Sequence, residues 1–270
     1  MSLKAFVKSH AKLMRAALWL MRMAAPFRTS LFSAIPRYSG FLLDWSRFRR
    51  AGGKAKVADF YPCLFDRTAA TQFDPHYFYQ AVWAMKNVMA HGTRSHVDVG
   101  SDVRFVGMLS VVTEVTFIDI RPLEVVLDNL SSRKGSILSL PYDDGAVSSL
   151  SSLHVIEHIG LGRYGDPIDP DGARKAAREL VRVLAPGGRL YVSAPIGRSR
   201  VQFNGHRVFG PQEIVGLFDG LALVDMAMVD GWGTYSPHVD PAAANVAHDG
   251  GWDYCLGMCI FEKMPHAHAG

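Results

Sequence analysis

Apolar and polar residues alternate from about residue 76 to residue 262 in a pattern of short strands and longer helices. The pattern predicts strands at 96–99, 112–120, 137–140, 147–154, 189–194, 221–229 and 254–261. It predicts helices at 76–90, 173–184 and 211–217. Strands that alternate with helices indicate a parallel sheet covered by helices on both faces. Ligands of such sheets bind beyond the carboxyl ends of the strands, so the residues that follow each strand are the first candidates for function.

The first 57 residues follow a different pattern, that of a basic amphipathic helix. At about 100° per residue, five cations fall within an arc of about 80°. They are Lys4, Lys8, Lys12, Arg15 and Arg22, and the apolar side chains opposite or beside them are Phe6, Leu13, Met14, Leu20 and Met21. Such a helix favours the surface of an anionic membrane. Two alternatives stay open, namely packing of the helix on the domain or on another subunit, and an organelle presequence.

The charge of the chain is divided between these two parts. The 270 residues carry a net charge of +4, but residues 1–57 hold twelve Lys or Arg and one acid, Asp44, which gives +11. The remaining residues therefore sum to −7, which argues against nucleic acid as the ligand of the main body. We predict a helical arm at 1–57 and an α/β domain at 58–265. With 49% hydrophobic residues, the chain has enough apolar material for a sizeable core.

Cysteine usage bears on the compartment. Cys63, Cys255 and Cys259 are too few and too scattered for a disulfide framework. This favours a reducing compartment, and we expect a cytoplasmic protein that associates peripherally with a membrane through residues 1–57. No run of about 18 uncharged apolar residues occurs, so no membrane-spanning helix is expected.

Polar residues stand at the ends of the first two predicted strands. The first strand ends in Asp98-Val99-Gly100-Ser101, where a glycine allows close approach of a ligand to the backbone. The second contains Asp119, twenty-one residues after Asp98. An acid at this spacing suits the two hydroxyls of a ribose, although it can also cap the next helix. The pair suggests a cofactor that contains adenosine.

The loop after the first strand favours one such cofactor over another. A nicotinamide dinucleotide needs the pyrophosphate cradle G-x-G-x-x-G. Here Gly100 is followed by Ser101-Asp102-Val103-Arg104-Phe105, so the second and third glycines are missing, and Asp102 would face the phosphates. S-adenosylmethionine has no phosphate and is compatible with this loop.

The joint order of motifs resembles a known superfamily. The motifs are Asp98-x-Gly100, Asp119, Leu140-Pro141-Tyr142-Asp143-Asp144, Glu157-His158 and Arg182-Val183-Leu184-Ala185-Pro186-Gly187-Gly188. Over residues 76–262 this order is similar to that of class I S-adenosylmethionine-dependent methyltransferases. The resemblance implies an α/β, Rossmann-like, doubly wound sheet of seven strands, mostly parallel with an antiparallel last strand. More narrowly, residues 154–172 and 203–207 resemble a methyltransferase-like family catalogued as domain of unknown function two-six-eight, which supplies no substrate.

This resemblance implies roles for individual residues. Gly100 would lie under the methionine part of the cofactor, Asp98 would hold the ammonium group through water, and Asp119 would bind the ribose. The full set expected to bind S-adenosylmethionine is Asp98, Gly100, Ser101, Asp119, Ile120, Ser136, Ile137 and His154. The wider superfamily often has an acid beside adenine, where this chain has Ser136.

The string His154-x-x-Glu157-His158 has a rival interpretation as part of a zinc-peptidase site. That chemistry needs both histidines on one face of a helix. Here His154 follows directly on predicted strand residues, so the two histidines are expected to diverge and we predict no metal site. Three interpretations stay open for Glu157 and His158: contacts to substrate, acceptance of a proton, or a structural hydrogen-bonded pair.

Two loops carry candidates for binding the acceptor, namely Arg163, Tyr164, Asp166, Asn204 and Arg207. The acid-rich loop 165–172 can hold a divalent cation or sugar hydroxyls, but we favour a rigid turn that caps the next helix. His206 follows the fifth strand, and its ordinary pKa suits a group that accepts a proton from a hydroxyl. The alternative for His206 is a loop histidine held by hydrogen bonds.

These observations lead to a main hypothesis and an alternative from another class. The main hypothesis is methyl transfer from S-adenosylmethionine to an oxygen or nitrogen of a membrane-associated glycan or a lipid-linked acceptor. His206 or His158 would accept the proton, and Glu157 would orient that histidine. The alternative is a non-catalytic scaffold with the same fold that docks at a membrane surface. A nicotinamide-dependent enzyme ranks third because of the missing glycines.

Overall fold

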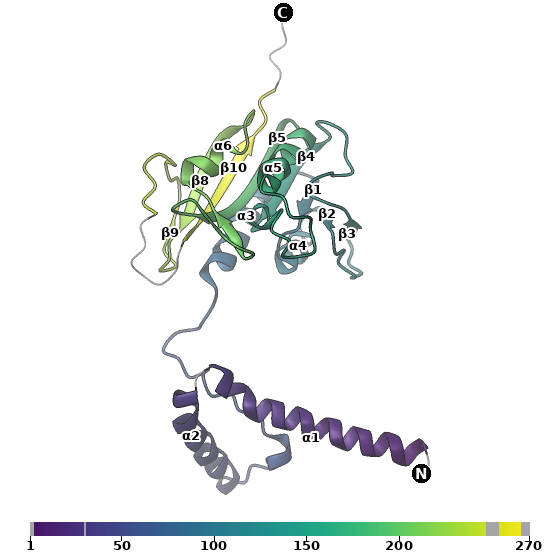
Figure 1. Cartoon of the computed structure of the whole chain (residues 1–270), viewed down its shortest axis with the longest axis vertical. Coiled ribbons are helices and arrows are strands. Elements are labelled where there is room, and N and C mark those ends of the chain that lie inside the picture. The colour runs from purple at the N-terminus through teal and green to yellow at the C-terminus, as the bar shows by residue number, and fades with distance from the viewer. Residues whose placement is uncertain (1–2, 30, 247–253, 266–270) are drawn as a thin grey trace, which may run out of the picture. The chain divides into compact units, whose positions relative to one another are not determined.

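The computed structural model describes residues 3–29, 31–246 and 254–265, and the chain divides into two compact units, Met1–Gln72 and Phe73–Gly270 (Figure 1). The first unit therefore continues past residue 57. The reason is that residues 57–72 contact its helices: the indole nitrogen of Trp19 donates to the Val57 carbonyl at 2.9 Å, and Arg67 pairs with Asp44 at 3.1 Å.

The first unit consists of two α-helices and a short 3-10 turn. They are α1 (Leu3–Thr29), α2 (Leu31–Arg50) and η1 (Val57–Asp59). Aromatic side chains hold them together. Tyr38 of α2 stacks on Phe27 of α1 with ring centroids 5.3 Å apart, and Phe60 meets Phe41 and Trp45 edge-on at 5.0 and 5.2 Å. Each helix thus presents one face to this aromatic cluster.

The second unit is built on one large sheet of mixed direction. Its strands are β1 (Ser95–Val99), β2 (Glu114–Asp119), β3 (Leu130–Lys134), β4 (Val147–Leu153), β5 (Leu184–Ile196), β8 (Ala222–Val229), β9 (Tyr235–Ser236) and β10 (Cys255–Glu262). The order across the sheet is β3-β2-β1-β4-β5-β10-β8-β9. Strands β1 to β5 are parallel, and β10 runs antiparallel to both of its neighbours. Strands β6 (Arg200–Gln202) and β7 (His206–Val208) form a separate antiparallel pair.

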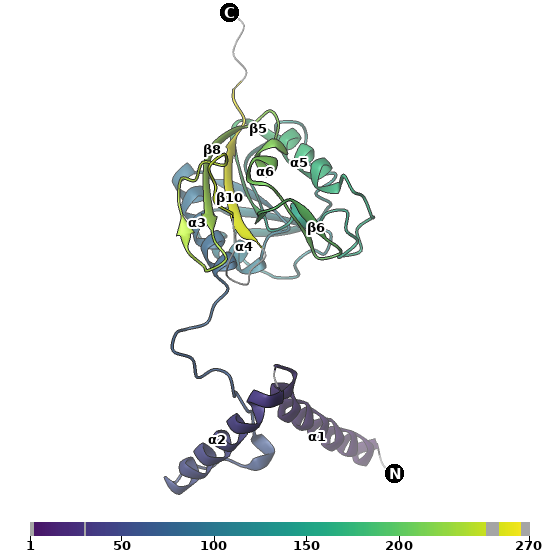
Figure 2. The same cartoon turned by 60° about the vertical axis from the view of Figure 1, so that its left-hand side comes forward.

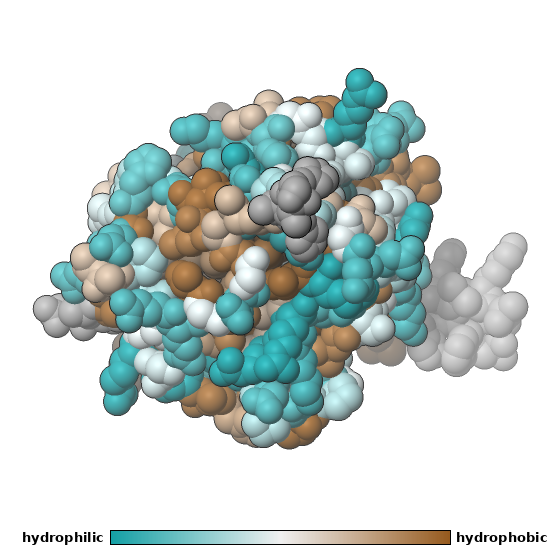
Figure 3. Space-filling model, turned by 90° about the horizontal axis from the view of Figure 1, so that it is seen from above, coloured by the Kyte–Doolittle hydropathy of each residue, from teal (hydrophilic) through white to brown (hydrophobic). Residues whose placement is uncertain are grey.

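Helices cover both faces of the large sheet (Figure 2). They are α3 (Pro75–His91) and α4 (Val103–Leu109) on one face, and α5 (Gly172–Val183) and α6 (Pro211–Gly216) on the other. Successive residues of a strand point to opposite faces of the sheet and so contribute to two separate hydrophobic cores. Phe117 and Tyr191 pack against α3 and α4, whereas Ile118 and Leu190 pack against α5 and α6. On the face seen in Figure 3, hydrophilic and hydrophobic residues are interspersed.

This architecture confirms the predicted fold class, with one local correction. Apart from the short edge strand β9, the doubly wound sheet has seven strands, which is the expected number. The predicted third strand at 137–140 is wrong, because the strand is β3 at Leu130–Lys134. As an edge strand β3 is mostly polar, so hydrophobic periodicity does not reveal it. The apolar run at 137–140 instead forms a loop whose Ile137 and Leu140 enter the core.

A buried polar network joins the ends of β1 and β4. The carboxylate of Asp98 accepts from the backbone N–H and the hydroxyl of Ser101, at 3.0 and 2.6 Å, and from the hydroxyl of Ser151. Because the Ser151 hydroxyl donates to Asp98, its oxygen accepts from Nε2 of His96, 2.8 Å away, and His96 Nδ1 contacts Ser149 at 2.7 Å. Burial raises the pKa of Asp98 to about 6 and lowers the pKa of His96 to about 3.

Ser151 serves two buried groups at once, so its hydroxyl should matter for stability. We expect Ser151→Ala to lower the free energy of unfolding by about 1 to 3 kcal/mol, because His96 and Asp98 each lose a partner that water cannot replace. Urea unfolding of the full chain measures this. Ser148→Ala removes an exposed hydroxyl from the same strand and should leave the midpoint almost unchanged. Equal midpoints for the two variants would contradict this account of the network.

Candidate functional site

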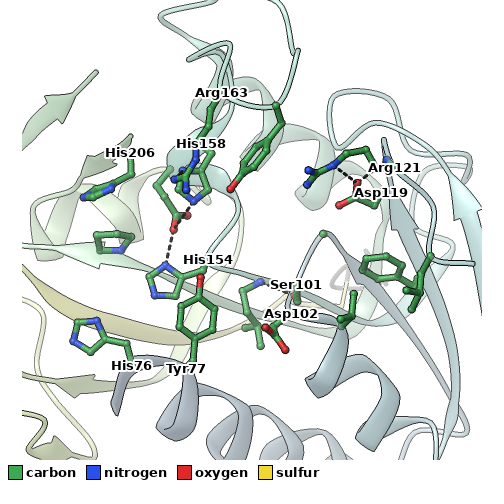
Figure 4. Close-up of a pocket in the computed structure, with 18 of the residues that line it drawn as sticks. His76, Tyr77, Ser101, Asp102, Asp119, Arg121, His154, His158, Arg163 and His206 are labelled. Atoms are coloured by element: carbon green, nitrogen blue, oxygen red, sulfur yellow. Dashed lines mark hydrogen bonds and ion pairs between the residues drawn. The ribbon is translucent and has the colours of Figure 1, made fainter. Parts of the chain in front are cut away.

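Two neighbouring cavities open at the carboxyl ends of β1, β2 and β4. One has a volume of about 820 Å³ and the other of about 290 Å³. Six residues line both cavities: Gly100, Asp119, Arg121, His154, His158 and Tyr164. In the close-up, His76, His154, His158 and His206 lie on one side, and Asp119 with Arg121 on the other (Figure 4). The site therefore combines a group of histidines with an acid at the end of β2.

The smaller cavity has a wall that only glycine can form. Gly100 has φ +75°, and a Cβ atom there would lie 3.2 Å from a methyl carbon of Val155 and 3.6 Å from a carboxylate oxygen of Asp119. Its backbone N–H donates to Ile118 at 3.0 Å, which joins the end of β1 to β2. A larger residue at position 100 would be strained and would narrow the space beside Asp119.

Asp119 lies beside Gly100, and its carboxylate can accept more hydrogen bonds than it does in this structure. One of its carboxylate oxygens accepts from the backbone N–H of Arg121 at 2.7 Å and lies 3.7 Å from the Arg121 guanidinium. The carboxylate remains part-exposed and lines both cavities. The other residues predicted to lie beside it, Ile120, Ser136 and Ile137, line the smaller cavity. These residues therefore lie around one cavity even though the predicted third strand was misplaced.

Asp98 does not lie where the resemblance suggested. It is fully buried, and its carboxylate is engaged by Ser101 and Ser151 beneath the loop. Among the described residues that line the two cavities, Asp98 is absent, whereas Ser101 lines the larger one. The expected contact of Asp98 with a cofactor ammonium group is thus corrected to support of the loop that carries Gly100.

The histidines of the larger cavity are organised around one buried carboxylate. Glu157 lies in the turn η2 (Ile156–His158), and its side chain is completely buried. Its Oε1 lies 2.6 Å from Nδ1 of His154 and 3.7 Å from Nε2 of His158. Burial by itself raises the pKa of Glu157, but the charges and the hydrogen bond of the histidines outweigh it and hold the pKa below its ordinary value.

Each histidine around Glu157 is held by a different neighbour. His154 follows β4 at φ +58°, its backbone N–H donates to Ser193, and its ring stacks on Tyr77 at 5.3 Å. His158 Nδ1 donates to the carbonyl of Gly205 at 2.7 Å. His206, at the start of β7, meets the ring of Tyr254 at 4.9 Å. Burial lowers the pKa of both His158 and His206.

Three buried polar atoms of this cluster have no hydrogen-bond partner within the described chain. They are Nε2 of His154, Oε2 of Glu157 and Nε2 of His206. Buried polar atoms in proteins are normally paired, so three in one cavity wall indicate a place for the polar groups of a ligand. The expectation that Glu157 orients His158 or His206 is corrected, because its hydrogen bond goes to Nδ1 of His154, while Nε2 of His158 lies 3.7 Å away.

The residues predicted to bind an acceptor fall into two groups. Arg163 and Tyr164 line the larger cavity, where the Tyr164 ring lies 5.1 Å from the Arg163 guanidinium and 4.6 Å from that of Arg121. Asp166 lines the smaller cavity, but one of its oxygens accepts from the backbone of Gly160 at 2.7 Å. The acid loop is therefore a hydrogen-bonded turn, as favoured from the sequence, but the expected cap is missing, because Asp171 precedes α5 without a side-chain hydrogen bond to the helix.

The other two candidates lie away from the cavities. Arg207 is buried, and its guanidinium donates to the carbonyls of Ile159 at 2.6 Å and of Pro170 at 3.2 Å. Asn204 is exposed, and neither residue is among the described lining residues of the two cavities. We correct the role of Arg207 to support of the loop behind Glu157, since its donors are used on backbone carbonyls.

Sequence reasoning missed part of the cavity wall. Asp74 caps α3 by accepting from the N–H groups of His76 and Tyr77, and all three line the larger cavity. Burial and the charge of His154 lower the pKa of His76 to about 4. The sequence pattern predicted a helix at 76–90 but did not place its first turn at the site. In the described residues, no group of three or more His, Cys, Asp or Glu is arranged to hold a metal ion.

Comparison with known proteins places this geometry in context. Residues 142–239 match a family described as "Caenorhabditis protein of unknown function, DUF268". No curated protein matches the sequence. The N-methyltransferase NodS of Bradyrhizobium japonicum, solved in complex with S-adenosylhomocysteine, is similar in structure, with a TM-score of 0.51, 16% identity, and coverage of 70% of this chain and 88% of that chain.

A second solved structure, which is named for a different reaction, has a similar fold. The [4+2]-cyclase SpnF aligns with a TM-score of 0.50 and 15% identity, covering 69% of this chain and 81% of that chain. At such identities the likeness shows the fold and leaves the reaction open. With the strand order and the glycine at the end of β1, these comparisons show that the chain has a Rossmann-like methyltransferase fold, within which residues 142–239 match the DUF268 family model.

Proposed function

We propose that the protein transfers a methyl group from S-adenosylmethionine to an oxygen or nitrogen atom of an acceptor bound in the larger cavity. The observation that carries the proposal is the junction of the two cavities, where Gly100, Asp119 and His154 line both, and where Nε2 of His154 has no partner in the described chain. When bound, S-adenosylmethionine supplies a methyl group on a positively charged sulfur, which is reactive toward a lone pair of an oxygen or nitrogen.

The smaller cavity fits the adenosine part of this cofactor. Asp119 offers a carboxylate with unused acceptor sites to the ribose hydroxyls, and Ile120, Ser136 and Ile137 provide a mostly apolar wall for adenine. The space that a Cβ at Gly100 would fill lies beside that carboxylate. Ser101 and Asp102 line the larger cavity next to this wall and are suited to the amino-acid part.

The histidines can hold the proton that a hydroxyl acceptor must lose. Because Nδ1–H of His154 donates to Glu157, the Nε2 atom of a neutral His154 carries the lone pair. The same reasoning applies to His158, whose Nδ1–H donates to Gly205. Nε2 of His206 is a second histidine nitrogen without a partner in the described chain. We therefore add His154 to His158 and His206 as a proton acceptor and assign to Glu157 the orientation of His154.

The nitrogen and oxygen atoms of this cluster also indicate which class of acceptor molecule the cavity can bind. Imidazole nitrogens and a carboxylate oxygen accept hydrogen bonds, so they suit a molecule with several hydroxyl or amino groups. Arg163 and Tyr164 at the rim can add polar and stacking contacts. These features support a glycan or a lipid-linked glycan as the acceptor class.

Binding of the cofactor should depend on Asp119. We expect S-adenosylmethionine and S-adenosylhomocysteine to bind the full chain, and Asp119→Asn to weaken both by about one to two orders of magnitude, because a charged acceptor of two hydroxyl hydrogens is lost. Isothermal titration calorimetry measures this. Glu114→Gln changes the exposed acid at the other end of β2 and should leave the affinity unchanged.

Two results would count against the proposed function. If neither ligand binds the unaltered chain, the non-catalytic scaffold becomes the better account of the fold. If both ligands bind but Asp119→Asn and Glu114→Gln behave alike, the cofactor lies elsewhere and the assignment of the smaller cavity fails.

The state of the histidines can be tested without knowing the acceptor. We expect the pKa of His158 to lie below its ordinary value of 6.5, since burial disfavours the imidazolium, so the ring stays neutral and able to accept a proton at lower pH. The carboxylate of Glu157 opposes this shift, so Glu157→Gln should lower the pKa of His158 further. Titration of the histidine ring protons by NMR reports both values.

The matched control for that titration is Glu124→Gln, which alters another acid of the larger cavity. Glu124 is not among the groups that shift the pKa of His158, so this variant should leave it in place. A pKa of His158 that stays constant or rises in Glu157→Gln would contradict the coupling between the two side chains.

A further inference from the structure

The first unit exposes an apolar stripe along α2 that no part of the described chain covers. The stripe consists of Phe32, Ile35, Leu42 and Leu43, which are 89%, 60%, 46% and 59% exposed. At about 100° per residue these four fall within an arc of about 100°. The remaining positions of the arc within the helix are Ser39 and Ser46, and a charged residue enters it only at Arg50, the last residue of α2.

Helix α1 has a similar stripe. Leu13, Met14, Leu20 and Met21 are 66%, 67%, 60% and 55% exposed. Ala17 and Ala24 lie between them on the same face and are also exposed. Large apolar side chains that gather on one face at such exposures mark a surface that binds something, in contrast to single exposed residues.

The opposite faces of both helices are already used inside the unit. Trp19 of α1 donates to Val57, and Phe41 and Trp45 of α2 pack on Phe60. Cations on these sides lie over aromatic rings, as Arg22 does over Tyr61 at 5.4 Å. The unit thus packs these aromatic side chains against one another and leaves the apolar stripes, Phe32 included, to solvent.

Charge indicates what covers the stripes. Residues 1–57 hold twelve Lys or Arg against Asp44, a net charge of +11, so a second copy of the same unit would meet strong repulsion. None of the described helices is long and apolar enough to cross a bilayer. A helix that combines an apolar stripe with an excess of cations binds the interface of an anionic membrane, with the stripe among the acyl chains.

We propose that α1 and α2 form a two-helix module that binds the surface of anionic membranes through these stripes. The proposal rests on the first unit alone and stands whether or not the second unit transfers methyl groups. It explains why the apolar stripes and the excess of cations occur in the same 57 residues, while the rest of the chain carries −7.

Vesicle co-sedimentation of the full chain tests the proposal. We expect binding to vesicles that contain phosphatidylcholine and phosphatidylglycerol, weaker binding to pure phosphatidylcholine, and loss of binding to the anionic vesicles as the salt concentration rises. The double variant Phe32→Asn/Leu43→Asn should reduce the affinity for the anionic vesicles at least about tenfold, because two inserted side chains are lost.

The matched control makes the same change on the second unit. Val126→Asn/Ile168→Asn alters two side chains that are also highly exposed, at 100% and 65%, and should leave vesicle binding unchanged. The proposal is overturned if both double variants bind alike, or if the chain does not bind anionic vesicles. Self-association that is lost in Phe32→Asn/Leu43→Asn, without vesicle binding, would instead assign the stripes to a second copy.

Discussion

The hydrogen bonds around the buried carboxylate of Asp98 fix the geometry on which the site depends. This carboxylate ties the N–H and hydroxyl of Ser101 to the end of β1, and the hydroxyl of Ser151 brings β4 to the same point. The Ser101 hydroxyl in turn accepts from the N–H of Leu153, the last residue of β4. One side chain therefore sets the turn at Gly100 and the exit of β4, from which His154 leaves. The positions of both cavities therefore depend on this hydrogen-bond network, although Asp98 lines neither cavity.

A second constraint is the burial of Glu157 beneath the histidines. A lone buried carboxylate would be costly, and here Nδ1–H of His154 donates to it at 2.6 Å, while Nε2 of His158 lies 3.7 Å away. Arg207 holds the turn from behind through backbone carbonyls, so the cluster is supported by a residue that does not face the cavity. The unpartnered atoms are thus built into a rigid wall, which is the arrangement that a ligand with polar groups requires.

The sequence predicted most of the sheet because most strands are buried on both faces and have strong apolar runs. It placed β3 too late because that edge strand is polar, and it assigned Asp98 and Arg207 to ligands because a sequence does not show which side of a loop a charge faces. The hydrophobic pattern placed His76 and Tyr77 in the predicted helix at 76–90 and not at the site. Their place at the site follows from the packing of α3 beside the end of β4, a contact between segments about 75 residues apart that no local pattern encodes.

The fold alone does not choose the reaction, since a protein named a [4+2]-cyclase and a protein named an N-methyltransferase share it with this chain. The positions of the polar atoms narrow the choice of reaction. The acid at the end of β2 and the glycine at the end of β1 border one cavity, and imidazole nitrogens kept neutral by burial border the other. A catalyst that moves a methyl group onto a hydroxyl needs a cofactor site and a proton acceptor that meet, and His154 lies where these two cavities join.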